Sequence, residues 1–127
     1  MATAPTANDQ QVDLLRGTVV SLVRRDGPDL TARQLAVFLT CYLVEGDHTV
    51  RGLAAELDVS KPAITRALDR LGEFDLARRK TDPADRRSIL VQKTPKGSAL
   101  LRDIKTIMAK VASGEKKTPP ASRRAAS

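Results

Sequence analysis

Apolar residues recur every three or four positions over most of this chain, a spacing that places them on one face of an α-helix. Five such stripes predict helices, at about residues 10–25, 31–45, 50–57, 60–74 and 94–111. In chain order the stripes are Val12, Leu15, Val19 and Leu22; Leu35, Phe38, Leu39 and Tyr42; Val50, Leu53, Ala54 and Leu57; Ile64, Leu68 and Leu71; and Leu100, Ile104, Ile107 and Val111. We expect these faces to supply an aliphatic core.

Turn-forming and capping residues separate the stripes and mark where helices begin. Thr31, Ser60 and Thr94 are good N-caps, because a short polar side chain can accept a hydrogen bond from a free backbone N–H of the first turn. Pro62 and Pro95 are tolerated in that turn, where the N–H groups have no partner within the helix. These residues support the predicted starts of the second, fourth and fifth helices.

From Leu76 onwards the apolar spacing changes to that of β-strands. It predicts strands at residues 76–80 and 88–92, joined by the turn-rich and basic segment 81–87. Residues 48–50 form either a very short strand or an extended lead-in to the third helix. Helices followed by a hairpin and a final helix predict a mostly α fold with a small β-hairpin, the winged helix-turn-helix.

Residues 53–66 have the residue types that a helix-turn-helix needs at its turn. A small residue is needed where the two helices cross, and Ala54 or Ala55 supplies it. Asp58 stands where the backbone needs a positive φ, which aspartate tolerates better than most residues. Val59 can tuck beneath the turn, and outward side chains near the start of the following helix can reach base edges in a major groove.

The length and the charge of the chain narrow its class. The 127 residues give room for one domain, and an aromatic content of 2% makes its core aliphatic. The net charge of +7 is displaced to the second half: residues 46–93 hold ten Lys and Arg against eight Asp and Glu, and residues 94–127 hold eight against two. Segregated positive charge is typical of nucleic-acid binding, although a solvated basic surface has the same composition.

Composition divides the chain into three parts. We expect a flexible arm over residues 1–9, a winged helix-turn-helix domain with terminal helices over 10–111, and a disordered basic tail over 112–127. The tail either adds phosphate contacts or only keeps the protein in solution. The sequence has no apolar run of membrane-spanning length and no signal peptide, so we expect a cytoplasmic protein, for which a single cysteine is also typical.

Few residues are candidates for catalysis or metal binding. Cys41 lies in the second predicted helix, where we expect a buried and inert thiol. His48 is the only histidine, and no Cys, Asp or Glu lies at ligand spacing on a common face with it. The sequence contains no nucleophile–base pair and no glycine-rich phosphate loop. It therefore predicts a protein that is not an enzyme and that has no cofactor or metal.

The predicted hairpin resembles the wing of the MarR family of bacterial transcription regulators. The likeness rests on residues 82–91, which read DPADRRSILV, and on the TPKG of residues 94–97. It covers a little over half of the chain and implies that Asp85 braces the wing and that Arg87 enters the minor groove, where negative potential is concentrated. Asp75 stands where the family commonly has glycine, and both terminal helices are shorter than those that usually form the dimer and the ligand pocket.

From the residues and the resemblance together we predict a sequence-specific transcription regulator that binds double-stranded DNA as a homodimer, with its recognition helix in the major groove and its wing in the minor groove. The candidate DNA-binding residues are Ser60, Lys61, Pro62, Thr65, Arg66, Arg70, Arg78, Arg79, Asp85, Arg86 and Arg87. A small-molecule effector is a further partner that the resemblance allows. Two alternatives stay open: an adaptor or antagonist that pairs with another regulator, and a DNA-coating protein with little sequence preference.

Overall fold

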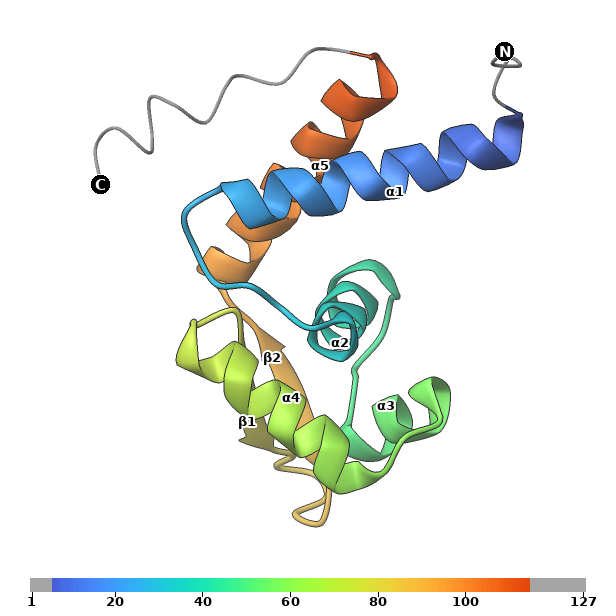
Figure 1. Cartoon of the computed structure of the whole chain (residues 1–127). Helices are drawn as coiled ribbons and strands as arrows, with labels where there is room; N and C mark the ends of the chain where they lie inside the picture. Colours follow the sequence, from blue (N-terminus) through green and yellow to red (C-terminus); the bar gives the residue numbers. More distant parts are fainter. Residues whose placement is uncertain (1–5, 115–127) are drawn as a thin grey trace. The chain divides into compact units, whose positions relative to one another are not determined.

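A computed structural model of the chain describes residues 6–114, which form five α-helices and one two-stranded antiparallel sheet (Figure 1). The elements are α1 (Ala7–Arg24), α2 (Ala32–Leu43), α3 (Val50–Leu57), α4 (Lys61–Glu73), β1 (Ala77–Thr81), β2 (Ile89–Lys93) and α5 (Pro95–Ala112). The predicted mostly α fold with a small hairpin is confirmed. Where the sequence indicated one domain, the contacts divide the chain into two units, one of residues 30–102 and the other of the segments on either side.

The first and last helices extend further than their apolar stripes indicated. Thr6 and Asp9 form a capping box, in which each side chain accepts a hydrogen bond from the other's backbone N–H at 3.1 Å. Helix α1 therefore begins at Ala7, and residues 7–9, which we expected in the flexible arm, are helical. Ala112, expected in the tail, belongs to α5, while residues 115–127 of the predicted tail and residues 1–5 of the predicted arm lie outside the described residues.

The unit of residues 30–102 has a largely aliphatic core to which α2, α3 and α4 contribute. The predicted stripe of α4 is confirmed, because Ile64, Leu68 and Leu71 are all buried. Helix α2 is rotated relative to the expected stripe: Val37, Phe38 and Cys41 are its buried residues, whereas the expected Leu35, Leu39 and Tyr42 are half-buried.

Helices α3 and α4 form the predicted helix-turn-helix. Asp58, between them, has φ 55° and ψ 48°, which confirms the expected left-handed turn. The Val59 N–H donates back to the Ala54 carbonyl at 3.0 Å, and Ala54 is buried while Ala55 is exposed. Ser60 caps α4 by accepting a hydrogen bond from the Ala63 N–H at 3.2 Å. The turn and cap therefore fix where α4 starts and which face it exposes.

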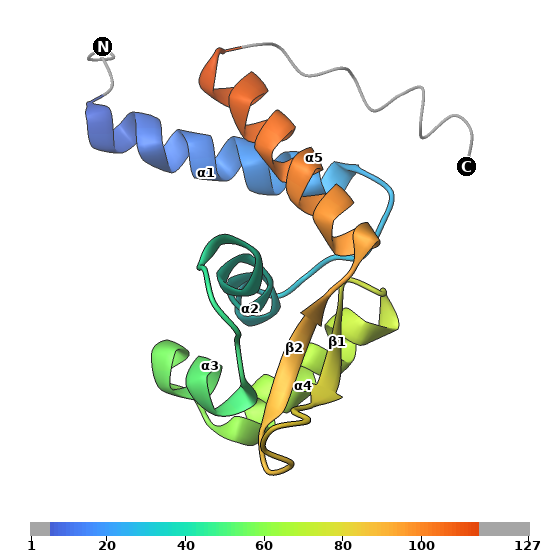
Figure 2. The same ribbon diagram turned by 180° about the vertical axis from the view of Figure 1, so that it is seen from behind.

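Strands β1 and β2 and the loop 82–88 between them form a hairpin that we call the wing. Each strand lies one residue later than expected, with Ala77 opposite Lys93 and Thr81 opposite Ile89. The chain before α3 runs along the other edge of β2 (Figure 2), where Thr49 bridges Leu90 and the Val91 N–H donates to the His48 carbonyl at 2.8 Å. Residues 48–49 are thus the short strand-like lead-in that the sequence allowed.

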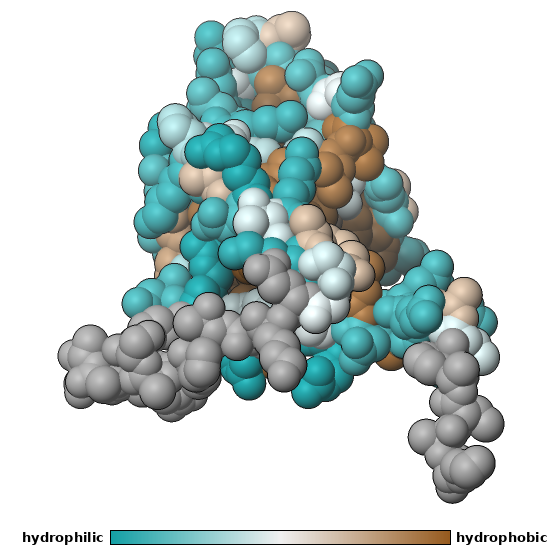
Figure 3. Space-filling view, turned by 90° about the horizontal axis from the view of Figure 1, so that it is seen from above, coloured by the Kyte–Doolittle hydropathy of each residue, from teal (hydrophilic) through white to brown (hydrophobic). Residues whose placement is uncertain are grey.

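The other unit contains α1 and the part of α5 from Asp103 on. Gly17 of α1 lies against Val111, whose Cγ1 would be 2.5 Å from a β-carbon at position 17, and Arg25 pairs with Asp103 at 2.9 Å. Much of the predicted apolar stripe of α1 stays at the surface: Val12, Leu15 and Val19 are 66%, 62% and 42% exposed. Figure 3 shows apolar residues, in brown, at the surface among hydrophilic ones. The core of this unit therefore does not absorb the whole stripe.

Candidate nucleic-acid interface

The first half of α4 exposes most of the residues that the sequence predicted to contact DNA bases. Lys61, Pro62 and Arg66 are exposed and Thr65 is half-buried, while the opposite face of the helix packs into the core. Ser60 is exposed, but its hydroxyl is occupied by the cap. Since the buried face holds the helix in one rotation, these side chains project together from one surface.

The cations of this surface fall into two groups. Within residues 6–114, Lys61 and Arg66 form no ion pair. Lys61 lies in the first turn of α4, at the positive end of the helix dipole, and Arg66 lies in the second turn. Arg70, one turn after Arg66, pairs with Glu73 at 2.7 Å, and its guanidinium carbon lies 4.5 Å from the centre of the Phe74 ring. The start of α4 therefore presents unpaired positive charge, and its end does not.

The base of the wing repeats the pattern of paired arginines. Arg78 donates two hydrogen bonds to one carboxylate oxygen of Asp75, at 3.0 and 2.8 Å. Arg79 pairs with Asp69 of α4 at 2.7 Å. Both residues of this second pair also line an open cleft of about 450 Å³, together with Leu68, Gly72, Arg78, Lys80, Thr81 and Ile89. Two of the predicted DNA-binding arginines are therefore held by acids of the same unit.

The tip of the wing, residues 82–88, is closed by hydrogen bonds of its own. The Asp85 carboxylate accepts from the Arg87 N–H at 3.1 Å, and the Asp82 N–H donates to the Ser88 carbonyl at 3.0 Å. Such an aspartate turn holds the backbone in place of a regular ladder. Arg86 and Arg87 are exposed and, within the described chain, form no ion pair. The tip thus presents two free guanidinium groups on a braced loop.

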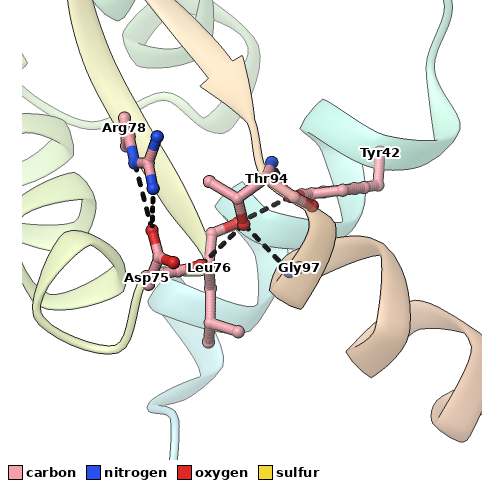
Figure 4. A network of polar contacts seen from close by, with 6 residues as sticks. All are labelled: Tyr42, Asp75, Leu76, Arg78, Thr94 and Gly97. Carbon is pink, nitrogen blue, oxygen red and sulfur yellow. Dashed lines mark hydrogen bonds and ion pairs between the residues drawn. The ribbon is translucent and has the colours of Figure 1, made fainter.

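A polar network at the root of the wing was not predicted from the sequence (Figure 4). The Tyr42 hydroxyl donates to the Leu76 carbonyl at 2.7 Å and accepts from the Thr94 N–H at 3.0 Å. The Thr94 hydroxyl donates to the Asp75 carbonyl at 2.6 Å and accepts from the Gly97 N–H at 2.9 Å. The network joins α2, the end of α4 and the start of α5, so it fixes where β1 begins and where β2 ends. Its one signal in the sequence was the TPKG motif.

Asp75 closes α4 in the manner that glycine otherwise would. Its φ is 56°, in the left-handed region, and its N–H donates to the Gly72 carbonyl at 3.0 Å. The Leu76 N–H then donates to the Leu71 carbonyl at 2.9 Å, so Leu76 belongs to the turn that closes α4, and β1 starts at the next residue, Ala77. The aspartate adds the carboxylate that holds Arg78, which a glycine could not.

Cys41 is packed in the core, and His48 contacts a backbone carbonyl. The Cys41 thiol is buried, as predicted, and burial raises its pKa to about 11. A ring nitrogen of His48, Nε2, lies 2.7 Å from the Val44 carbonyl oxygen. Among residues 6–114, no three His, Cys, Asp or Glu side chains are grouped so that they could hold a metal ion. Across the same residues, no helix combines the length and hydropathy needed to cross a bilayer.

A helix-turn-helix whose second helix exposes its start beside a braced basic hairpin defines a winged-helix protein. A model of the MarR family matches residues 28–88, the stretch from the lead into α2 to the end of the wing tip. Over these residues the chain is similar to the MarR family. No curated protein is similar enough to the chain to count as a match.

Solved structures of similar proteins include three regulators. A mutant of MepR from S. aureus is 19% identical with a TM-score of 0.67, and the match covers 82% of this chain and 74% of that one. The transcriptional regulator Tm0710 from Thermotoga maritima is 24% identical with a TM-score of 0.60, over 85% and 73%. A mutant of MarR from E. coli, complexed with operator DNA, is 28% identical with a TM-score of 0.63, over 83% and 71%.

Proposed function

We propose that this protein reads duplex DNA with α4 in the major groove and with the wing tip in the minor groove. The match to the MarR family model over residues 28–88 and the likeness to MarR complexed with operator DNA support the class of function, a DNA-binding transcription regulator. The observation that carries the groove assignment is the distribution of free cations. Lys61 and Arg66 at the start of α4, and Arg86 and Arg87 at the wing tip, have no acidic partner within residues 6–114.

The chemistry of the two groups of cations fits the two grooves. An arginine or lysine on a helix in the major groove can donate to the O6 and N7 acceptors of guanine, so Arg66 and Lys61 are the proposed base-reading residues. An arginine in the minor groove gains from the negative potential there without reading a particular base. Arg87, held by the Asp85 turn, is the proposed minor-groove residue.

Replacing Arg66 by alanine tests base reading by α4. The probes are a duplex that the protein selects from a random pool and a duplex of mixed random sequence. We expect Arg66→Ala to weaken binding of the selected duplex by about 1–3 kcal/mol, and binding of the random duplex by much less. Arg102→Ala, which removes the same charge from an exposed position on α5, is the control. Equal losses on both duplexes would rule out base reading by Arg66.

Replacing Arg87 by alanine tests the wing. We expect affinity for both duplexes to fall to a similar extent, and the slope of log K against log salt to become shallower by about one phosphate equivalent or less. Unchanged affinity would remove the wing tip from the interface. If the unmodified protein retards neither duplex at low salt and instead co-purifies with another regulator, the adaptor alternative replaces this proposal.

A homodimer completes the proposal, with the exposed apolar stripe of α1 shared between two copies. Val12, Leu15, Val19 and Val23 lie on one face of that helix and are all exposed. A two-fold axis would bury each copy's stripe and would match a palindromic DNA site. We expect Leu15→Glu to give a monomer in light scattering and Gln10→Glu, a charge on an exposed residue of the opposite side of the same helix, to leave the dimer intact. A monomeric unmodified protein would overturn this part.

A further inference from the structure

The pair between Asp69 and Arg79 differs from the other two arginine pairs beside the proposed interface. The Arg70–Glu73 and Arg78–Asp75 pairs each join residues three positions apart, whereas Asp69 lies on α4 and Arg79 on β1. Successive residues of a strand point to opposite faces, so Arg79 lies on the same face of β1 as the buried Ala77. Its guanidinium is thereby directed to α4, and the 2.7 Å pair crosses from the reading helix to the wing.

The charge balance of the helix-turn-helix and the wing shows why an acid paired with Arg79 needs an explanation. The chain as a whole carries +7, but residues 46–93, which contain the helix-turn-helix and the wing, carry ten cations against eight anions. A regulator that only needed affinity for DNA would gain from every free arginine here, since each phosphate contact releases counterions whatever the base sequence. Instead Arg79 has a carboxylate placed against it from the neighbouring element.

We propose that Asp69 restrains Arg79 and so limits the sequence-independent affinity of this protein for DNA. The inference rests on the proposed DNA-binding function. With Asp69 present, a phosphate that approaches Arg79 must displace one carboxylate and meets its negative charge. The free cations at the start of α4 and at the wing tip are left to bind DNA, while Arg79 adds little to contacts with random sequence. Weak binding to random sequence matters for a regulator, because non-operator sites vastly outnumber operators.

The pair contributes little to the fold, which makes the proposal testable. The two side chains are 42% and 52% exposed, and exposed ion pairs have small effects on stability. Asp69→Asn keeps the shape and removes the charge. Asp103→Asn is the matched control, because Asp103 is also an exposed partner of an arginine, at 2.9 Å from Arg25, and lies in the unit that carries neither α4 nor the wing.

The experiment titrates each protein with the random-sequence duplex and with the selected duplex over a series of salt concentrations. We expect Asp69→Asn to bind the random duplex about fivefold more tightly near 0.15 M salt, with a slope steeper by about one phosphate. Asp103→Asn should behave as the unmodified protein. In an Arg79→Gln background the Asp69→Asn change should lose its effect on the random duplex, because no guanidinium is left to release.

Three results would overturn the inference. The random duplex could bind Asp69→Asn no more tightly than the unmodified protein, or the tightening could persist in the Arg79→Gln background. Alternatively, Asp69→Asn could lose affinity for the selected duplex alone, which would make Asp69 a direct reader of a base, such as an acceptor for a cytosine amino group. If the unmodified protein binds neither duplex at low salt, the proposed DNA-binding function itself fails. If it binds DNA but gives one of the three results above, only the inference about Asp69 fails.

Discussion

The hydroxyl of Tyr42 on α2 occupies the space that a β-carbon at Gly97 on α5 would need. The same hydroxyl is held by two hydrogen bonds, to the Leu76 carbonyl at 2.7 Å and from the Thr94 N–H at 3.0 Å (Figure 4). It cannot move aside without leaving these backbone groups unsatisfied. Glycine at position 97 is therefore required by the close approach of two elements at the root of the wing.

Replacing Gly97 by alanine should accordingly destabilise the fold. We expect the free energy of unfolding to fall by about 1–3 kcal/mol or more, the usual cost of forcing extra atoms into a packed site. Gly72→Ala is the control, since a β-carbon there would lie 3.6 Å from the Ala77 carbonyl oxygen, an ordinary contact, and alanine favours the helix by about 0.5–1 kcal/mol. Urea denaturation would show opposite signs, and equal losses from both variants would contradict the explanation.

Asp58 in the turn of the helix-turn-helix makes a second prediction about stability. At φ 55° a residue with a β-carbon is strained, and alanine lacks the polar side chain that helps aspartate adopt this conformation. We expect Asp58→Ala to lower the free energy of unfolding, and Asp58→Gly to be more stable than Asp58→Ala by about 1 kcal/mol. If thermal or urea unfolding gave the same stability for both variants, backbone strain would not be the deciding property of this position.

Spacing alone predicted which segments are helical, but it predicted their rotation and ends less well. Helix α2 has apolar residues on almost every side, so stripes through Leu35 and through Val37 fit the sequence equally and only the packing selects the second. The start of α1 depends on the pairing of Thr6 with Asp9, which lies before the first apolar position. In contrast, the single stripe of α4 left no ambiguity, and its buried face was predicted correctly.

The candidate interface was predicted by residue type, whereas the pairing of its charges depends on the fold. The spacing of Arg70 and Glu73 on one helix could have indicated their ion pair. Asp69 and Arg79 are brought together only by the direction in which the hairpin leaves α4, which no local pattern encodes. The Tyr42 network is equally non-local, because it joins residues more than thirty positions apart.

The role of Asp85 in the wing can be separated from its charge. Its carboxylate oxygen accepts a hydrogen bond from the Arg87 N–H, and the amide oxygen of asparagine can do the same. We expect Asp85→Asn to bind a selected duplex at least as tightly as the unmodified protein, because the turn is kept and a negative charge is removed. Asp85→Ala should bind more weakly, since the loop that presents Arg87 loses its brace. Fluorescence anisotropy would measure both, and weak binding by Asp85→Asn would show that the charge itself is needed.

The thiol of Cys41 links folding to alkaline pH. Burial raises its pKa from 9.0 to about 11 in the folded protein, against a smaller opposite effect of the charge of Lys93. Between these values the unfolded chain releases the thiol proton and the folded chain retains it, so stability must decrease as the pH rises through this window. A pKa shift of this size lowers the free energy of unfolding by about 2–3 kcal/mol once the pH is above both values, and this loss is absent below about pH 9.

Replacing Cys41 by alanine should remove that pH dependence. The variant loses some stability at every pH because it leaves a small cavity, but its free energy of unfolding should change less between about pH 8 and about pH 10.5 than that of the unmodified protein. Urea titrations at both pH values, in the presence of a reducing agent, measure the difference, and other alkaline groups cancel in the comparison. An equal loss of stability with pH in both proteins would mean that the buried thiol does not set the alkaline limit of the fold.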